Sequence, residues 1–563
     1  MPISTSYNLL KFALSFSNSK EPTKAIIKDF IPQKPNILTD DNSTKLERVS
    51  PESVGIDSKY LESFFNEVEN DHSIFMNRCL IIKDSKIIGE KVKKPYDINT
   101  WNASFSLTKT TIGLAIGFLY DDGLITLDEL AYKILVPKLT TLTLNTRLIT
   151  IKHLLCNTTG SKFNEAYCAV SNSWVKDFFQ TGTKFKPGTS FDYNSLNTYI
   201  LSAIVKIKTG KSVSEYLKEK LYDPLEIYDF KYSLSPESIE EGGWGLYITP
   251  MDMAKLGLLI LNKGVYNNKQ IISKEWIEEM TKTQIKVGRN GEHFNYGYQI
   301  WVKDDESTLV FNGLFDQDIV IFKNTGIIAL WCSSNNDAFH SNRVHKISEK
   351  YFKDEIKENY KYVERFGESD LINDDSLIPI YDKYLKSHTY VPLEDNALSS
   401  SILPVMIQAT LNTFASGIES ITFKKDKGTY ILSFKADNAD YDLLFKVGKF
   451  TRQSINLYGN AYDIATDIVF RRDDEYTPYI LMRIYFLEFA SQRFIKIRFT
   501  KTKGEFKLIL TENPSTDFVE KLIEIQDAKT KKFIKSATNI LTPDLVEARI
   551  NKILNPSFTM KKI

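Results

Sequence analysis

A serine and a lysine, Ser106 and Lys109, lie three residues apart at the start of a long apolar stretch. Residues at positions i and i+3 share one face of a helix, so the hydroxyl and the amine can meet. A serine is a weak nucleophile until a neighbouring group takes its proton, and a lysine held out of water has the lowered pKa that this requires. Taken alone, the pair predicts a nucleophile with its base no better than an ordinary capped core helix in which Lys109 reaches solvent.

The stretch that follows predicts a buried helix. Residues 112–119 are apolar on nearly every face, Ser104 or Asn102 can cap its start, and Gly123 suits its C-terminal end. A helix that is apolar all round lies inside a domain. Its N-terminal N–H groups are therefore expected to open into a protected site and to favour a developing oxyanion.

Two later segments can supply the remaining parts of a serine hydrolase. Tyr193 follows a turn at Pro187-Gly188, and a phenol beside an ammonium group can act as base and then as acid near neutral pH. The alternative for Tyr193 is a loop aromatic packed on the core. Gly313 lies inside an expected strand pair and permits close approach, so that Leu314 can offer its backbone N–H, although a simple strand with a glycine bulge fits the same pattern.

Composition limits the class of protein. The chain has 563 residues, of which 42% are hydrophobic and 25% charged, with a formal net charge of +1. These values predict a globular protein of several domains and exclude a nucleic-acid or anionic-membrane surface. No apolar stretch reaches the ~18 residues that span a membrane. Because the four cysteines and six histidines show no ligand spacing, we expect neither a metal site nor a cofactor.

The short apolar run near the N-terminus has no basic region before it and no clean cleavage site after it. We therefore expect a cytoplasmic protein, with a weak export signal left open. The expected partner is a small-molecule ester or amide substrate, and an oligomer is left open.

These segments, in this order, resemble the serine β-lactamase and penicillin-binding-protein superfamily, nearest its class C-like esterases and nylon-oligomer hydrolases. The resemblance covers about residues 48–350, and Ser106-Leu107-Thr108-Lys109 matches the S-x-x-K motif. The other matching segments are 50–57, 122–128, 150–160, 186–195, 224–225 and 242–247.

The resemblance implies a role for each matching residue. Ser106 would be the acylated nucleophile, Lys109 its base or electrostatic partner, and Tyr193 the general base and acid. The N–H groups of Ser106 and Leu314 would form the oxyanion hole. The remaining residues expected to bind substrate are Gly313, Ser195 and Asn312.

Two departures from the family pattern narrow the expected substrate. Ser195 replaces the asparagine of the family's Tyr-x-Asn motif, as in the nylon-hydrolase-like branch. The third motif begins with Asn312 and lacks a cation, so the carboxylate of a β-lactam or peptidoglycan stem would lose its counter-ion. Asp316, in place of a glycine, either favours a cationic substrate or points to the surface.

We therefore predict a serine hydrolase that cleaves an ester or small amide through an acyl-enzyme. The alternatives are a β-lactamase or D-amino-acid peptidase, and a catalytically silent binding or scaffolding protein with the same fold.

The predicted fold class is α+β, with an antiparallel sheet flanked by helices and interrupted by a helical insertion, followed by a C-terminal antiparallel β domain. Both ends of the first domain are expected to supply strands to one sheet. The predicted division is a poorly structured leader over 1–47, a β-lactamase-like domain over 48–362, a linker over 363–389, a lipocalin-like β domain over 390–515 and a helical tail over 516–563.

Overall fold

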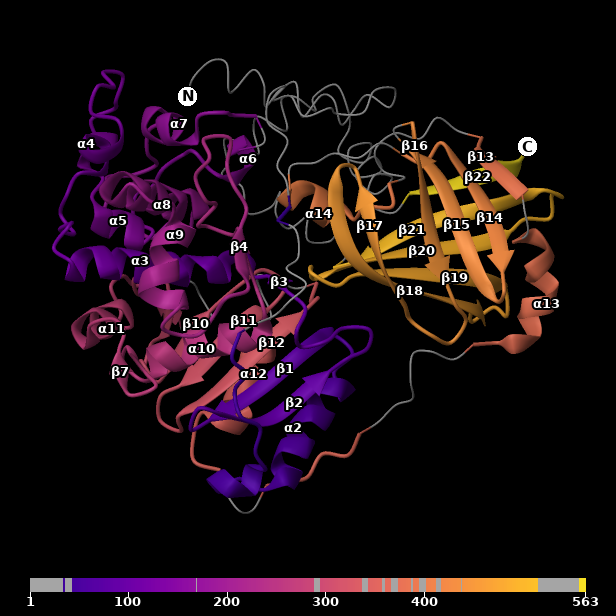
Figure 1. The fold of residues 1–563 in the computed structure, drawn as a ribbon, viewed down its shortest axis with the longest axis horizontal. Coiled ribbons are helices and arrows are strands. Elements are labelled where there is room, and N and C mark those ends of the chain that lie inside the picture. Colours follow the sequence, from indigo (N-terminus) through magenta and orange to yellow (C-terminus); the bar gives the residue numbers. More distant parts are fainter. Residues whose placement is uncertain are drawn as a thin grey trace. The chain divides into compact units, whose positions relative to one another are not determined.

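The structure is a computed structural model that describes residues 34–35, 43–168, 170–287, 294–336, 343–356, 360–365, 373–385, 388–393, 401–411, 417–436, 438–514 and 556–563. It divides into two compact units (Figure 1). The first unit comprises Met1–Ser6 and Pro35–Phe366, and the second comprises Tyr7–Lys34 and Gly367–Ile563.

The first unit is built on a seven-stranded antiparallel sheet. Its strands, in order across the sheet, are β2 (Lys86–Val92), β1 (Met76–Lys83), β12 (Ile327–Ser333), β11 (Gln317–Phe322), β10 (Thr308–Phe311), β9 (Trp301–Lys303) and β8 (Phe294–Tyr296). The sheet thus joins the two strands that start the unit to the five that end it, which confirms the predicted α+β class. The smaller sheets contain β3 (Asn102–Ala103), β5 (Leu246–Ile248) and β4 (Phe230–Tyr232), and β6 (Val265–Tyr266) with β7 (Lys269–Gln270).

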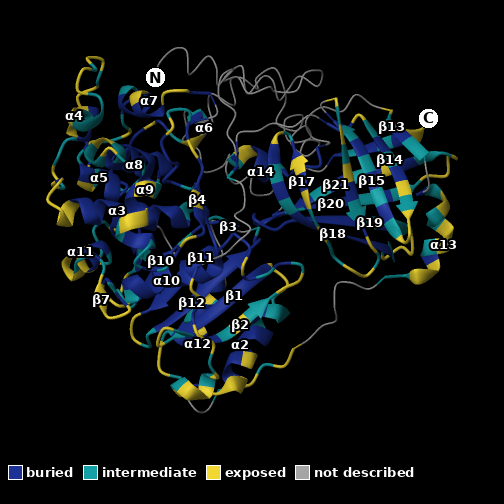
Figure 2. Ribbon diagram, in the orientation of Figure 1, coloured by how far each residue is buried: buried dark blue, intermediate teal, exposed yellow. Residues whose placement is uncertain are grey.

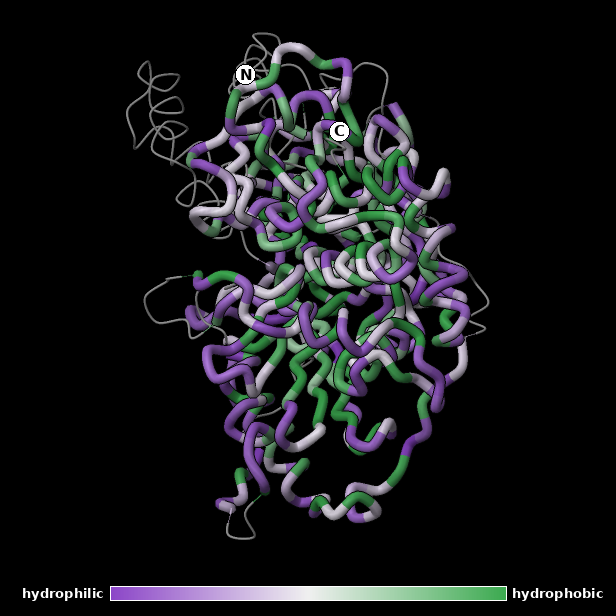
Figure 3. Tube along the Cα trace, turned by 90° about the vertical axis from the view of Figure 1, so that its left-hand side faces the viewer, coloured by the Kyte–Doolittle hydropathy of each residue, from purple (hydrophilic) through white to green (hydrophobic). Residues whose placement is uncertain are grey.

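Successive residues of the central strands enter two different cores. In β11, Ile319 and Ile321 join the core that contains helices α3 and α10, whereas Val320 and Phe322 join the core that contains α2 and α12. Side chains alternate across a strand, so a strand that is apolar at every position fits a sheet covered on both faces. The central strands are accordingly buried in Figure 2, and in Figure 3 the hydrophilic segments lie largely at the periphery.

The helices of the first unit lie mostly in the insertion between β3 and β8. Those outside it are η1 (Pro51–Val54), α2 (Ser58–Asn70) and α12 (Arg343–Phe352). Those within it are η2 (Phe105–Leu107), α3 (Thr108–Asp121), α4 (Ala131–Leu135), η3 (Thr146–Leu148), α5 (Ile151–Leu155), α6 (Glu165–Cys168), α7 (Trp174–Gln180), α8 (Ser195–Thr209), α9 (Val213–Leu217), η4 (Lys218–Tyr222), α10 (Pro250–Leu261) and α11 (Lys274–Met280).

The α3 helix is buried from Thr108 to Leu119, as its apolar sequence predicts, but both predicted N-caps, Ser104 and Asn102, are wrong. The structure places the N-cap at Leu107 with no side-chain cap, because the turn η2 intervenes between β3 and the helix. Ser104 Oγ instead donates to the Leu246 carbonyl oxygen at 2.8 Å. Gly123, with φ of 69°, lies just beyond the helix end as expected.

The second unit contains a ten-stranded antiparallel sheet, which confirms a C-terminal antiparallel β domain. Its strands, in order across the sheet, are β16 (Ala439–Phe445), β15 (Thr429–Ala436), β14 (Ser420–Asp426), β13 (His388–Pro392), β22 (Ser557–Lys562), β21 (Glu505–Asn513), β20 (Ser491–Phe499), β19 (Pro478–Phe486), β18 (Asn460–Arg472) and β17 (Thr451–Leu457). Its helices are η5 (Asp375–Leu377), α13 (Ile378–Tyr381), η6 (Asp382–Tyr384) and α14 (Val405–Thr410).

Three predicted segments need comment. The helical tail is wrong for Ser557–Lys562, which pairs as β22 between β13 and β21 and buries alternate residues; residues 515–555 lie outside the described residues. Within the predicted linker, η5, α13 and η6 are ordered, and the Asp374 N–H donates to the Phe470 carbonyl oxygen of β18. Most of the predicted leader also lies outside the described residues.

Candidate active site

The Ser106 hydroxyl lies where a short strand turns into a buried helix. Strand β3 ends at Ala103, η2 carries Ser106, and α3 begins at Thr108. Phe105, just before the serine, has a φ of 47°, a conformation that costs a residue with a Cβ atom about 1–2 kcal/mol. Such strain persists where the surrounding structure imposes it, and it is concentrated at functional sites. Ser106 stays partly exposed although both of its neighbours are buried.

The Lys109 side chain is only 2% exposed, and three oxygens surround its amine. Nζ lies 2.9 Å from Ser106 Oγ, 3.0 Å from Ser195 Oγ and 2.7 Å from the Gly243 carbonyl oxygen. A carbonyl oxygen can only accept, so Gly243 takes one N–H. A neutral amine has a second N–H for Ser195 and a lone pair for the Ser106 hydroxyl. The three contacts are therefore open to a neutral amine, which can accept a proton, as well as to an ammonium, whose three N–H groups would donate to the three oxygens.

The electrostatic surroundings favour a neutral lysine. Burial lowers the pKa of Lys109 to about 7, from an ordinary value of 10.5, and the Glu165 carboxylate opposes this shift. Glu165 Oε1 accepts a hydrogen bond from the Ser195 N–H at 2.9 Å, which holds the carboxylate near the lysine. A large fraction of Lys109 is therefore neutral near pH 7 and able to take the Ser106 proton.

Tyr193 lies beside this pair. The Tyr193 ring stacks on Trp301, with ring centroids 5.7 Å apart. The Lys109 Nζ lies 4.8 Å from the centroid of the Tyr193 ring. Burial raises the pKa of Tyr193; a hydrogen bond with Ser106 opposes the rise, and nearby carboxylates add to it. Because burial prevails, the phenol is protonated at neutral pH. Between the two residues, the geometry and the pKa shifts favour Lys109 as the proton acceptor.

The loop between β10 and β11 packs directly on the turn that carries Ser106. A Cβ atom on Gly313 would lie 2.4 Å from the Ser104 carbonyl oxygen and 2.8 Å from the Gln317 carbonyl oxygen, so no side chain fits there. The next residue, Leu314, has a backbone N–H with no hydrogen-bond acceptor among the residues that the structure describes. An unpaired N–H on a loop that packs against the turn carrying Ser106 meets one requirement of an oxyanion hole.

The other predicted residues of this loop are engaged within the protein. Asn312 Nδ2 donates to Asp318 Oδ1 at 2.9 Å, so its amide is bonded to β11. Asp316 is buried and accepts a hydrogen bond from Asn335 Nδ2 at 2.5 Å, which rules out the surface position that was one of its two predicted places.

Sequence patterns alone missed three partners of the site. The Gly243 carbonyl accepts from Lys109, and a Cβ atom there would lie 2.6 Å from the Ser195 carbonyl oxygen, so the Gly242-Gly243 pair was the available signal. Glu165 gave no signal, because its contact depends on the packing of α6 against α8. Gln317 Nε2 donates to the carbonyl oxygens of Phe315 and Ser333, at 3.0 and 2.7 Å, and holds the loop that contains Leu314.

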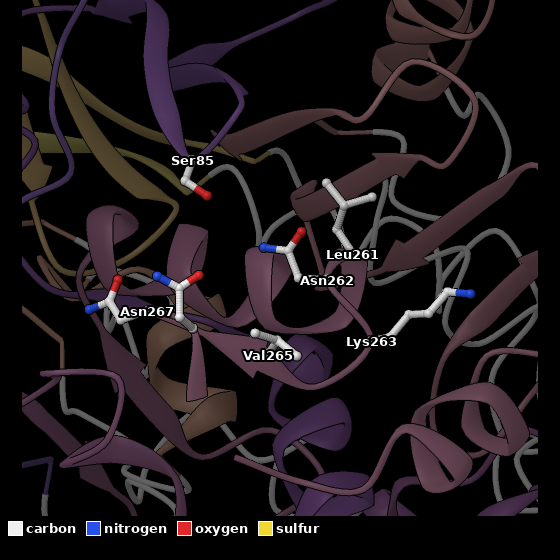
Figure 4. A pocket seen from close by; sticks show the side chains of 7 residues that line it. Ser85, Leu261, Asn262, Lys263, Val265 and Asn267 are labelled. Carbon is white, nitrogen blue, oxygen red and sulfur yellow. The ribbon is translucent and has the colours of Figure 1, made fainter. Parts of the chain in front are cut away.

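A separate surface hollow lies in the first unit (Figure 4). It is lined by Ser85, Leu261, Asn262, Lys263, Val265, Asn267 and Asn268. It shares no residue with the site around Ser106. Within the described ranges, no cluster of three or more His, Cys, Asp or Glu side chains could hold a metal ion. In the same part of the chain, no helix has the length and apolar character needed to cross a membrane.

Comparison with known proteins gives the family of the first unit. A family model described as Beta-lactamase matches residues 79–347, which include Ser106, Lys109, Tyr193 and Leu314. This domain is β-lactamase-like. The predicted resemblance to the serine β-lactamase and penicillin-binding-protein superfamily is thus confirmed, and the members of this family are generally serine hydrolases.

One curated relative of this chain is an uncharacterized protein of Alkalihalophilus pseudofirmus. It is 27% identical over 220 residues, which cover 35% of this chain and 60% of the relative. The chain therefore spans about 60% of the length of the curated relative that it matches.

Several solved structures are also similar. A candidate 6-aminohexanoate-dimer hydrolase from Bacillus anthracis is 20% identical, with a TM-score of 0.44, and covers 60% of this chain and 92% of its own. An octameric penicillin-binding-protein homologue from Pyrococcus abyssi is 16% identical, with a TM-score of 0.42, and covers 80% and 98%. A hydrolase with promiscuous acyltransferase activity is 14% identical, with a TM-score of 0.44, and covers 52% and 98%.

Proposed function

We propose that this protein is a serine hydrolase that cleaves an ester or small amide through an acyl-enzyme on Ser106. The observation that carries the proposal is the buried Lys109 amine, 2.9 Å from Ser106 Oγ and with its pKa lowered to about 7. A buried lysine without a carboxylate bonded to its amine is costly to a fold, and a proton acceptor beside a serine is a use that accounts for it.

The contacts of Ser106 with Lys109 and with Tyr193 support the proposed proton path. Neutral Lys109 takes the Ser106 proton as Oγ attacks the substrate carbonyl carbon, and the oxyanion forms between the N–H groups of Ser106 and Leu314. The Lys109 ammonium then returns its proton toward the leaving group, with the Tyr193 hydroxyl as the intermediate donor. Water attacks the acyl-enzyme by the same path in reverse, which restores the Ser106 hydroxyl.

The proposed substrate is an ester or small amide with no carboxylate requirement. The third motif begins at Asn312, whose amide is bonded to Asp318, so it offers no cation to a carboxylate. Tyr193 contacts Ser106, and the rings of Trp301 and Phe191 pack next to Tyr193, so we expect them to suit an apolar acyl group.

Covalent labelling tests the proposal. A fluorophosphonate probe is expected to add once to the wild-type protein, and peptide mapping by mass spectrometry is expected to place the adduct on Ser106. An unlabelled wild-type protein would show that the proposal is wrong. A panel of p-nitrophenyl esters and aminoacyl amides then sorts the substrate class, and a β-lactam adduct that is rapidly hydrolysed would favour a β-lactamase instead.

The pH dependence of labelling is a first prediction. Because neutral Lys109 is the acceptor, the labelling rate is expected to rise with pH through a midpoint of about 7. Glu165→Gln keeps an acceptor for the Ser195 N–H but removes the charge that raises the pKa of Lys109, so the midpoint should move to lower pH. Labelling rates across a pH series measure it.

Glu219→Gln is the matched control for that shift, because Glu219 pairs with Lys211 at the surface. It should leave the midpoint in place. Equal midpoints for Glu165→Gln and the wild-type protein would contradict the assignment of the rise in labelling rate with pH to Lys109.

Gly313→Ala is a second prediction. The added methyl group has to displace either the Ser104 carbonyl or the loop between β10 and β11. A shift of about 1 Å between reacting groups costs about 10²-fold in rate. We expect kcat for the best ester of the panel to fall by that order. Gly326→Ala controls for stability, because it has φ of 67° and open space around it and should cost about 1–2 kcal/mol without loss of kcat. Equal kcat in the two variants would contradict the role of this loop.

A further inference from the structure

The loop that carries Leu314 is held from behind by a buried carboxylate. Asp318 on β11 is fully buried, and its Oδ1 accepts hydrogen bonds from the Gly313 N–H at 3.0 Å and from Asn312 Nδ2 at 2.9 Å. These two donors lie at the start of the loop, directly before Leu314. The carboxylate therefore helps to fix the Asn312-Gly313 peptide, together with the Gln317 carbonyl oxygen, which also accepts from the Gly313 N–H at 3.0 Å. This peptide directly precedes the one that carries the Leu314 N–H.

The other end of the loop is held by Gln317. Its Nε2 donates to the Phe315 carbonyl oxygen at 3.0 Å, and its Oε1 accepts from Asn102 Nδ2 at 2.7 Å. The Leu314 N–H itself has no acceptor among the described residues, and the Gly313 carbonyl oxygen of the same peptide accepts from the Gln317 N–H at 3.3 Å. The side chains of Asp318 and Gln317 hold the residues on either side of Leu314.

A histidine from a separate helix completes the contact. His345 on α12 is 6% exposed, and its Nε2 lies 2.6 Å from Asp318 Oδ2. Oδ1 already has two donors, so His345 supplies the donor for Oδ2, and without it this oxygen of a buried carboxylate would lose that hydrogen bond. The same histidine ring lies 6.0 Å from that of Phe294 on β8. The contact between His345 and Asp318 thus joins α12 to β11 next to the loop that carries Leu314.

The charges around His345 support a donating ring. Burial lowers the pKa of His345. The negative charges of Asp318, Asp316 and Glu349 together have the larger effect, so the pKa of His345 is raised. Glu349, on the same helix, is paired with Lys303 of β9.

We propose that Asp318 and His345 are positioning residues for acyl transfer, which hold the Gly313-Leu314 peptide where its N–H can stabilise the oxyanion on Ser106. This inference rests on the proposed hydrolase function. Neither residue touches substrate in the proposal. Both act through the loop, so their loss should lower kcat more than it raises KM.

Variants of His345 that differ in reach test the proposal. His345→Gln places an amide N–H near the position of Nε2 and is expected to retain most of kcat. His345→Asn is one methylene shorter and cannot reach Asp318, and His345→Leu has no donor. Both are expected to lower kcat about 10²-fold, as a displaced oxyanion donor should, with KM changed by less than about twofold.

Ser348→Ala is the matched control on the same helix. Ser348 Oγ is buried and accepts a hydrogen bond from Trp331 Nε1 at 3.0 Å, so its loss destabilises α12 without touching the loop. Thermal unfolding is measured for every variant, and kinetics are measured well below each Tm. Ser348→Ala should lower Tm and keep kcat.

The possible outcomes separate the two proposals. If His345→Asn and His345→Leu keep the kcat of Ser348→Ala, the positioning role is wrong. If His345→Leu does not fold, the comparison of His345→Asn with His345→Gln decides, and equal kcat in those two overturns the inference. If the wild-type protein itself forms no Ser106 adduct and turns over no ester, the proposed function has failed.

Discussion

Ser106→Ala is expected to remove ester turnover and fluorophosphonate labelling together. The Ser106 hydroxyl is the only nucleophile that the proposed path uses, and its loss should lower kcat at least about 10⁴-fold, because the remaining groups can only bind and polarise the substrate. The fold should be retained, since Ser106 is partly exposed and its neighbours hold the turn. Intact-mass spectrometry after labelling and initial rates on the best ester measure the two effects.

Ser212→Ala is the control for the loss of a serine hydroxyl. Ser212 caps helix α9 by accepting from the Glu215 N–H, and its loss costs about 1 kcal/mol of stability. This variant should be labelled at the wild-type rate. If Ser106→Ala were labelled as fast as Ser212→Ala, the nucleophile would have to be another residue, and the roles given to Lys109 and Tyr193 would be wrong with it.

Local sequence patterns predicted the part of the site that depends on local geometry. Ser106 and Lys109 are three residues apart on one helical face, and their side chains meet at 2.9 Å. The hairpin between β1 and β2 is also set locally, since Asp84 and Ser85 both have positive φ, as a two-residue turn requires. Such features need no knowledge of the rest of the chain.

The contacts that tune the site depend on tertiary packing and could not be predicted in this way. The Gly243 carbonyl lies 134 positions from Lys109 in the chain, and the Glu165 carboxylate reaches the Ser195 N–H from a different helix. His345 is an isolated histidine in its sequence context, and only the packing of α12 on β11 brings it to Asp318. Sequence period and spacing carry no information on which side chains face each other across elements.

The wrong prediction at the C-terminus has a similar cause. Ser557–Lys562 is a short segment with Phe558 and Met560 buried and polar residues between them. Its period of two was present, but it is too short to outweigh the helical composition of the preceding residues. Its pairing with β21, about fifty positions earlier in the chain, decides its structure.

Lys109→Met is expected to slow acylation of Ser106 about 10³-fold, because general-base catalysis by a positioned group contributes about 10²–10⁴-fold. Methionine keeps the unbranched shape of the side chain, so the core around α3 should remain packed. Stability should not fall in parallel. A lysine with a pKa of about 7 in the folded state and 10.5 in the unfolded state binds more protons when unfolded, so it destabilises the fold at neutral pH on the order of a few kcal/mol, and this cost fades as pH rises from 7 toward 10.5.

A second buried lysine provides the control for this last variant. Lys255 is fully buried and pairs with Asp252 at 2.9 Å, so Lys255→Met is combined with Asp252→Asn to leave no buried carboxylate unpaired. The double variant should label at the wild-type rate, whatever its Tm. Labelling rates and Tm at pH 7 and pH 9 then separate loss of the base from loss of stability as the cause of slow labelling. An unchanged or raised Tm with slow labelling in Lys109→Met identifies the amine as a group that the fold keeps for chemistry at the expense of stability. Labelling of Lys109→Met within about threefold of the control would contradict its role as the base, because even the weakest general-base contribution exceeds that ratio.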